Sequence, residues 1–100
     1  MAQTQGNIKE RERIGLQEPR KFKVIFHNDD FTTMEFVVEI LMKVFRHTQA
    51  KAEALMLAVH KDGKATVGIY PMDIAFTKVE IATNMARQNN FPLKLTCEPV

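Results

Sequence analysis

Three consecutive polar residues, Asn28, Asp29 and Asp30, offer one amide and two carboxylates with few basic residues nearby. They follow the apolar run 22–26 and precede a long helical pattern, so they lie on a loop held at both ends by rigid elements. Such a concentration of acceptors suits a cation or a strong hydrogen-bond donor. The alternative is a plain turn, because Asn and Asp readily hydrogen-bond their own backbone.

His60 is a second candidate for the same chemistry. It comes one helical turn after Met56 and directly after Val59, so it borders an apolar helix face. If this helix packs beside the preceding one, the imidazole can approach the 28–30 loop. An amide oxygen, a carboxylate and a neutral imidazole nitrogen could then accept the three N–H groups of a protonated α-amine. Taken alone, a histidine at such a position is more simply a structural or surface residue.

Four apolar residues on two predicted helices could line a pocket beside these acceptors: Met34 and Val37, then Met56 and Val59. Methionine side chains adapt to the shape of a ligand. Burying one large apolar side chain of a ligand contributes roughly 1.5–3 kcal/mol. Taken singly, the same residues are equally typical of a hydrophobic core.

The sequence offers little for catalysis. It contains no serine, no HExxH zinc motif and no glycine-rich phosphate loop, and the acidic loop does not follow the EF-hand pattern. The single cysteine, Cys97, lies in a terminal predicted strand with no histidine near it in sequence. We therefore expect a binding protein without metal or cofactor. A small aminopeptidase-like hydrolase using the acidic and histidine cluster remains an alternative.

Apolar periodicity predicts the elements that position these residues. Strands are expected at 22–27, 65–70 and 91–98, and helices at 34–47, 50–61 and 72–88. Thr32 or Thr33 can cap the first helix, and Gly63 can take a positive φ after the second. The order β-α-α-β-α-β predicts one compact α+β domain, with a three-stranded antiparallel sheet packed against three helices.

Composition divides the chain into two parts. Residues 1–19 are polar and charged, which predicts a flexible N-terminal extension before a core domain at 20–100. Residues 1–23 hold six basic and three acidic side chains, and the remainder holds eight and nine. The remainder therefore predicts no basic face and no nucleic-acid partner. A single cysteine and the absence of a membrane-length apolar run favour a cytoplasmic protein.

Two segments make the sequence recognisable: FKVIFHNDDFTTMEFV at 22–37 and LMLAVH at 55–60, followed by Gly63, Lys64 and Ala65. Over residues 20–98 they closely resemble the bacterial ClpS family of adaptors. The resemblance implies a monomeric adaptor that is not an enzyme. Such an adaptor binds proteins whose N-terminal residue is Phe, Tyr, Trp or Leu. It delivers them to the AAA+ unfoldase ClpA for degradation by ClpP.

The same resemblance assigns roles by position. Asn28, Asp30 and His60 would hold the α-amine, with Asp29 assisting. The hydrophobic pocket would comprise Phe26, Thr32, Met34, Val37, Met56, Val59 and Leu93. Met34 resembles the gatekeeper that excludes β-branched side chains.

On the third predicted helix, Asp73 and Lys78 match positions with which the family contacts the N-terminal domain of the unfoldase. The chain departs from the family pattern in the pocket, where Phe26 is bulkier than the usual aliphatic residue. It departs in the loop as well, where Thr33 replaces a common proline. A small ribosome- or RNA-associated α+β binding module is the alternative function.

Overall fold

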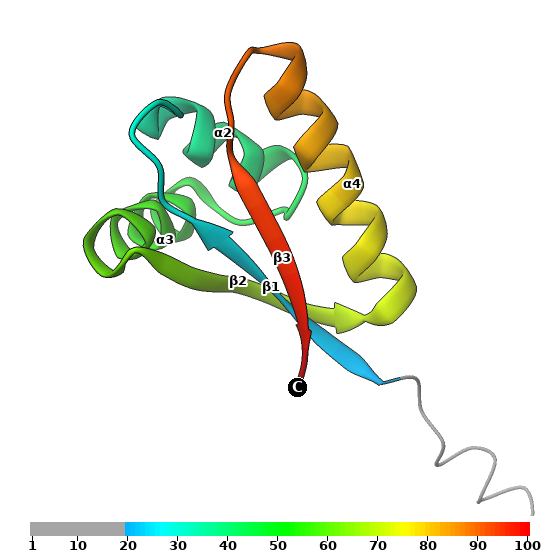
Figure 1. Cartoon of the computed structure of the whole chain (residues 1–100). Helices are drawn as coiled ribbons and strands as arrows, with labels where there is room; N and C mark the ends of the chain where they lie inside the picture. The colour runs from blue at the N-terminus through cyan, green and yellow to red at the C-terminus, as the bar shows by residue number, and fades with distance from the viewer. Residues whose placement is uncertain (1–19) are drawn as a thin grey trace, which may run out of the picture.

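Strand β1 (Lys21–His27) is the centre of the sheet. In this computed structural model, which describes residues 20–100, β1 pairs antiparallel with β2 (Lys64–Pro71) on one side and with β3 (Lys94–Pro99) on the other. The strand order is β2-β1-β3 (Figure 1). The predicted three-stranded antiparallel sheet is confirmed.

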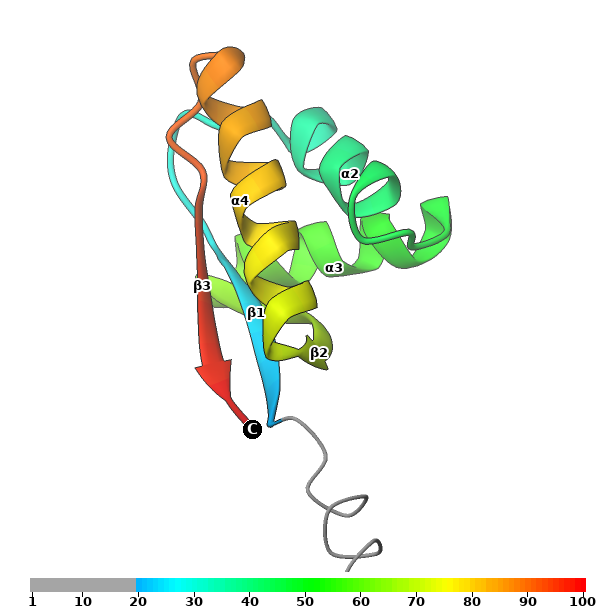
Figure 2. The ribbon, with the colours of Figure 1, turned by 90° about the vertical axis from the view of Figure 1, so that its right-hand side faces the viewer.

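Three helices cover one face of this sheet: α2 (Met34–Lys43), α3 (Gln49–Asp62) and α4 (Met72–Gln88). Figure 2 shows them together on one side of β1 and β3, while no described element covers the opposite side. The order β-α-α-β-α-β and the α+β class are as predicted. The predicted flexible extension, residues 1–19, lies outside the described residues.

The core lies between the sheet and the helices. Val24 and Phe26, which point to the same face of β1 because side chains alternate along a strand, are both fully buried. From α2, Ile40 and Leu41 are buried against them in the same cluster. The Phe26 ring meets the edge of Phe45, with the ring centroids 5.4 Å apart. This packing fixes the second half of α2, and the residues just after it, relative to the end of β1.

Short polar contacts set the helix ends. The Thr33 hydroxyl accepts the N–H of Phe36 at 3.1 Å and so caps α2, which decides between the two threonines proposed from the sequence. Gly63 ends α3 with φ 87°, the left-handed conformation that glycine adopts without steric cost. β2 can therefore begin directly after α3.

Two predicted boundaries are wrong. Helix α2 ends at Lys43 instead of 47, because the chain turns at Arg46, whose φ is 63°, and the N–H of His47 bonds back to the carbonyl of Leu41. Strand β3 begins at Lys94 instead of 91. The guanidinium of Arg87 donates to the carbonyls of Phe91 (2.7 Å) and Leu93 (3.1 Å), so a side chain satisfies these backbone groups.

Candidate functional site

The loop between β1 and α2 is built around the carboxylate of Asp29. Its Oδ1 accepts the N–H groups of Phe31 (2.8 Å) and Thr32 (2.7 Å), and its Oδ2 accepts the hydroxyl of Thr32 (2.8 Å). Both oxygens are thus used within the loop itself. The geometry gives Asp29 a positioning role: it holds the loop in which its neighbours are presented.

These contacts change the titration of Asp29. Partial desolvation acts to raise its pKa, but the N–H groups of Thr32 and Phe31, the Thr32 hydroxyl and the charge of Arg87 hold the pKa below the ordinary aspartate value. A carboxylate with a lowered pKa in the folded state stabilises that state above its unfolded pKa of about 3.9. This contribution is lost as the pH falls through the folded-state pKa.

We therefore predict that Asp29→Asn destabilises the domain most at neutral pH. The amide keeps the shape and one acceptor but loses the charge that the loop donors stabilise. The difference in free energy of unfolding between wild type and variant should shrink as the pH is lowered from about 6 to about 2. Urea denaturation across this range measures it, and a difference that stays constant with pH would contradict the assignment.

Three other polar side chains at the site are free to bind a ligand. Asn28, Asp30 and His60 are exposed, and none of the side-chain hydrogen bonds among residues 20–100 involves them. The N–H of Asn28 donates to the carbonyl of Gly63 at 2.9 Å. This bond fastens the loop to the end of α3, the helix that carries His60. The predicted approach of His60 to the loop is thus explained by one backbone contact.

A cavity of about 440 Å³ lies between this loop and helices α2 and α3. It is lined by Asn28, Asp29, Asp30, Phe31, Thr32, Thr33, Met34, Glu35, Val37, Met56, Val59 and His60. The four residues predicted to hold an α-amine are all among them. Five of the seven predicted pocket residues are there as well.

Exposure changes across the apolar wall of this cavity. Met34 is 44% exposed, whereas Val37 and Val59 are only 7% and 3% exposed. Met56 is intermediate. The flexible thioether of Met34 therefore stands at the entrance, and the two valines form the deeper wall.

Phe26 and Leu93, the other two predicted pocket residues, are not among the side chains that line this cavity. Their exposures are 0% and 1%, and both belong to the core cluster. The Phe26 ring fills the space against Phe45 and does not face the cavity. The family resemblance assigned these two residues to the pocket, and their burial follows from how the sheet and the helices close on one another.

Three lining residues were not predicted as part of the site: Phe31, Thr33 and Glu35. Phe31 is 75% exposed, an unusual state for a large aromatic side chain. Its place directly after the acidic pair was the available signal. Glu35 lies in the first turn of α2, where the helix dipole favours a carboxylate.

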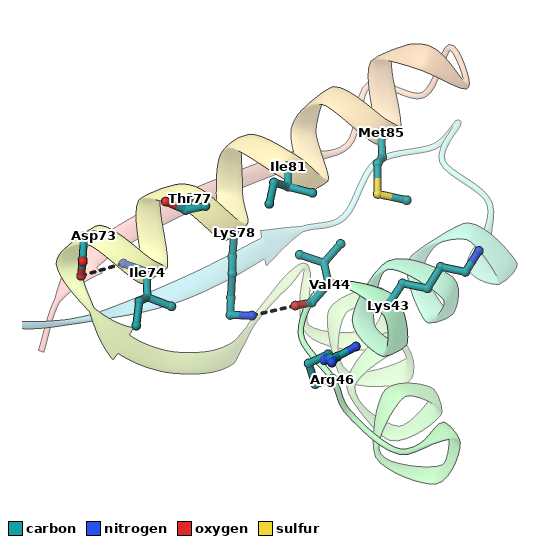
Figure 3. A pocket seen from close by; sticks show the side chains of 9 residues that line it. All are labelled: Lys43, Val44, Arg46, Asp73, Ile74, Thr77, Lys78, Ile81 and Met85. Atoms are coloured by element: carbon teal, nitrogen blue, oxygen red, sulfur yellow. Dashed lines mark hydrogen bonds between the residues drawn. The ribbon is translucent and has the colours of Figure 1, made fainter.

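A second concave surface lies between α4 and the turn after α2, and Asp73 and Lys78 both line it (Figure 3). The Lys78 ammonium donates to the carbonyl of Val44 at 2.7 Å and lies over the Tyr70 ring, 5.3 Å from its centroid. Asp73 accepts only the N–H of the adjacent Ile74 at 2.9 Å among the described contacts. Lys78 is therefore held by its own domain, and Asp73 is the more available of the two.

The sheet face without helices is basic, contrary to the prediction of a folded part with no basic face. The register places His27 between Lys64 and Lys94, and Lys23 opposite Glu98 on the same face. Desolvation, then the charges of Lys94 and Lys64, lower the pKa of His27. The charge count missed this face because it grouped Lys21 and Lys23 with the residues before them, whereas both belong to β1.

Within residues 20–100, no cluster of three or more His, Cys, Asp or Glu residues is placed to hold a metal ion. No helix in this part of the chain is long and apolar enough to cross a membrane. Burial raises the pKa of the Cys97 thiol, which is the opposite of the shift that activates a nucleophilic cysteine.

An α+β domain with hydrogen-bond acceptors at the mouth of an apolar cavity is typical of a small protein that binds a ligand. The family model for the ATP-dependent Clp protease adaptor protein ClpS matches residues 17–96. The chain is 49% identical over 90 residues to the ATP-dependent Clp protease adapter protein ClpS of Clostridium acetobutylicum, covering 90% of this chain and 87% of that protein. It is 46% identical over 92 residues to the ClpS of Acetivibrio thermocellus, covering 92% and 93%.

A solved structure is similar throughout its length. Agrobacterium tumefaciens ClpS2 bound to L-phenylalaninamide superposes with a TM-score of 0.80 at 38% identity, covering 83% of this chain and 100% of that one. The chain belongs to the ClpS family of Clp protease adaptors. It is accordingly an adaptor protein and not itself a protease.

Proposed function

We propose that this adaptor recognises proteins by a destabilising N-terminal residue, Phe, Tyr, Trp or Leu. One observation carries the proposal: no side chain or backbone group of residues 20–100 occupies the side-chain acceptors of Asn28, Asp30 and His60. They lie at the edge of the cavity that Met34, Val37, Met56 and Val59 line. A free α-amine needs three acceptors, at least one of them charged, and its side chain needs an apolar enclosure. The site offers both within one cavity.

The ligand of the similar structure supports this assignment. L-phenylalaninamide combines a free amine, a benzyl side chain and an amide where the next peptide bond of a protein would begin. It is thus a minimal model of a chain that starts with phenylalanine. The present cavity, of about 440 Å³, has room for one large side chain beside its polar edge.

Met34 supports a preference for unbranched side chains. It stands exposed at the entrance, so an incoming side chain must pass its thioether before it reaches Val37 and Val59. A β-branched residue carries its bulk next to the backbone, where it would meet Met34 at the entrance. We therefore expect Leu and the aromatic residues to enter and Ile and Val to be excluded.

The test is fluorescence anisotropy with short labelled peptides that differ only in residue one: Phe, Tyr, Trp, Leu, Ile and Ala, with N-acetyl-Phe as control. We expect micromolar or tighter binding of the first four, and loss of binding on acetylation, because acetylation removes the ammonium charge and two N–H donors. Equal binding of all peptides, or binding that survives acetylation, would overturn the proposal.

Delivery is the second half of the proposed function. We assign the unfoldase ClpA as the partner, with Asp73 and Lys78 contacting its N-terminal domain and ClpP degrading the delivered chain. The concave surface at α4 is separate in its lining residues from the proposed ligand cavity, which lets both partners bind at once. Degradation of a Phe-initiated fluorescent protein by purified ClpA and ClpP, with and without this adaptor, tests the assignment. We expect a cytoplasmic monomer.

The basic sheet face favours a second candidate function, an RNA-associated module. Lys21, Lys23, Lys64 and Lys94 lie on this face, which would suit phosphate groups. Against it, the apolar residue Ile25 lies among them at the centre of the face, and no Phe, Tyr or Trp of β1–β3 shares the face for stacking. Tight binding of a single-stranded RNA oligonucleotide that weakens steeply with salt would favour this candidate.

A further inference from the structure

The connection between α4 and β3 is held by one side chain, Arg87. Its Nη1 donates to the carbonyl of Phe91 at 2.7 Å and to that of Leu93 at 3.1 Å. A guanidinium suits this task because its N–H groups are fixed in one plane and it stays charged at any ordinary pH. The connection itself is irregular: Asn90 has φ 63°, and the N–H of Phe91 bonds back to the carbonyl of Ala86 at 2.8 Å. Arg87 therefore determines how the chain leaves the end of the helix.

This connection borders the acceptor loop and the start of α2. Side chains from the loop and from the connection line one hollow of about 530 Å³: Phe31, Arg87, Asn90, Phe91 and Pro92. The Phe91 ring also packs on the ring of Phe36 in the first turn of α2, with the centroids 4.8 Å apart. The segment that Arg87 holds thus supports the chain directly after the ligand acceptors Asn28 and Asp30.

Arg87 also acts on the loop through its charge. Desolvation raises the pKa of Asp29, but the loop donors of Thr32 and Phe31, together with the charge of Arg87, lower it further than desolvation raises it. Among the described residues no salt bridge joins Arg87 to Asp29 directly, so both carboxylate oxygens stay with the loop donors. The guanidinium favours the ionised form of Asp29, which is the form that holds the loop.

We propose that Arg87 is a positioning residue for the ligand site: it holds the connection between α4 and β3 against the loop, and so keeps Asn28 and Asp30 where a protonated α-amine can meet them. Arg87 does not line the site cavity and acts only through the loop. The proposal rests on the proposed recognition of N-terminal residues. It gives α4, whose other end carries Asp73, a part in ligand binding as well.

The experiment measures two properties of Arg87→Met, which keeps an unbranched side chain but has neither charge nor donor. Anisotropy titration should show that a Phe-initiated peptide binds about three- to tenfold more weakly. Carboxyl NMR titration without ligand should show that the midpoint of Asp29 rises toward the ordinary aspartate value. Arg87→Lys, which restores the charge but not the planar fork, should reverse part of both changes. A loss of stability alone would leave the titration of Asp29 in the folded protein unchanged.

Two exposed residues provide matched controls. Asn89→Ala removes a side-chain bond to the carbonyl of Met85, 2.9 Å long, at the same end of α4. Lys51→Gln removes one positive charge from α3. Neither side chain lines the site cavity or the hollow beside Phe31, so both variants should bind peptide and titrate as wild type does. If Arg87→Met does not fold, Arg87→Gln, which keeps a donor for one carbonyl, replaces it with the same expectations.

Each outcome supports or overturns the positioning role. Weaker binding together with a raised Asp29 midpoint, in Arg87→Met and in neither control, supports it. Wild-type affinity in Arg87→Met, or weaker binding with an unchanged Asp29 midpoint, overturns it and leaves recognition of the first residue standing. An equal loss in Asn89→Ala or Lys51→Gln also overturns it, because fraying of the helix end or net charge would then be sufficient. If wild type binds no Phe-initiated peptide, the proposed function is wrong and the role of Arg87 falls with it.

Discussion

Replacing Asp30 with alanine is expected to weaken binding of a Phe-initiated peptide about 10- to 100-fold, because a charge-assisted hydrogen bond to the ligand ammonium is lost. Asp30 is exposed and makes no side-chain hydrogen bond within the described part of the chain. Its removal should therefore leave the free energy of unfolding within about 0.5 kcal/mol of wild type. Anisotropy titration and urea denaturation of the same preparation measure both quantities.

Two matched variants test whether the weaker binding of Asp30→Ala comes from the lost contact with the ligand. Asp62→Ala removes the same charge from an exposed residue at the end of α3 that does not line the cavity, so it should bind peptide nearly as well as wild type. Asp29→Ala removes three contacts within the loop, so it should lower stability and weaken binding less than Asp30→Ala does. If Asp62→Ala weakened binding as much as Asp30→Ala, the effect would be one of net charge and not of contact.

Phe26→Ala is expected to lower the free energy of unfolding by about 3–5 kcal/mol, the range for deleting a buried aromatic ring. Phe26 is fully buried in the central strand and meets Phe45 edge to face. Domains of this size are stable by only about 5–15 kcal/mol, so the variant should be marginally folded. The midpoint of urea denaturation, with the slope checked for constancy, gives the value.

The control for this prediction is the same substitution at an exposed ring. Phe31 is 75% exposed, so Phe31→Ala should change stability by less than about 0.5 kcal/mol. A loss at Phe26 no larger than that at Phe31 would mean that Phe26 can leave the core at little cost. It would then be available to the ligand cavity after all, as the sequence resemblance implied.

Much of the site could be predicted because its residues follow simple periodicities. Val24 and Phe26 alternate along β1, and the spacing of three or four residues placed Met34 with Val37 and Met56 with Val59 on helix faces. Once the apolar faces of these strands and helices are known, few arrangements remain in which they can pack against one another. The predicted order of elements and the grouping of acceptors with apolar residues both follow from these patterns.

Other features depend on single dihedral angles that residue types do not determine. Asp29 and Asp30 are chemically identical, and only the turn of the loop decides that Asp29 faces inward. Val44 and Phe45 are 8% and 4% exposed and continue the apolar spacing of α2, although the helix has already ended. Because these two apolar residues continue the helical spacing, the sequence predicted a helix that extends past Lys43. No pattern marks the left-handed turn that comes next.

The bond from the N–H of Asn28 to the carbonyl of Gly63 has a consequence for how quickly ligands exchange. It continues the pairing of β1 with β2, in which His27 lies opposite Lys64, so the two halves of the site cannot separate without opening the end of the sheet. The backbone that carries the acceptors is then held in place before any chain arrives, so the adaptor loses little backbone entropy on binding. The residence time of a ligand should then depend on how fast its own contacts break, and not on a conformational change of the adaptor. An adaptor built this way can release one chain and accept the next without rearranging itself.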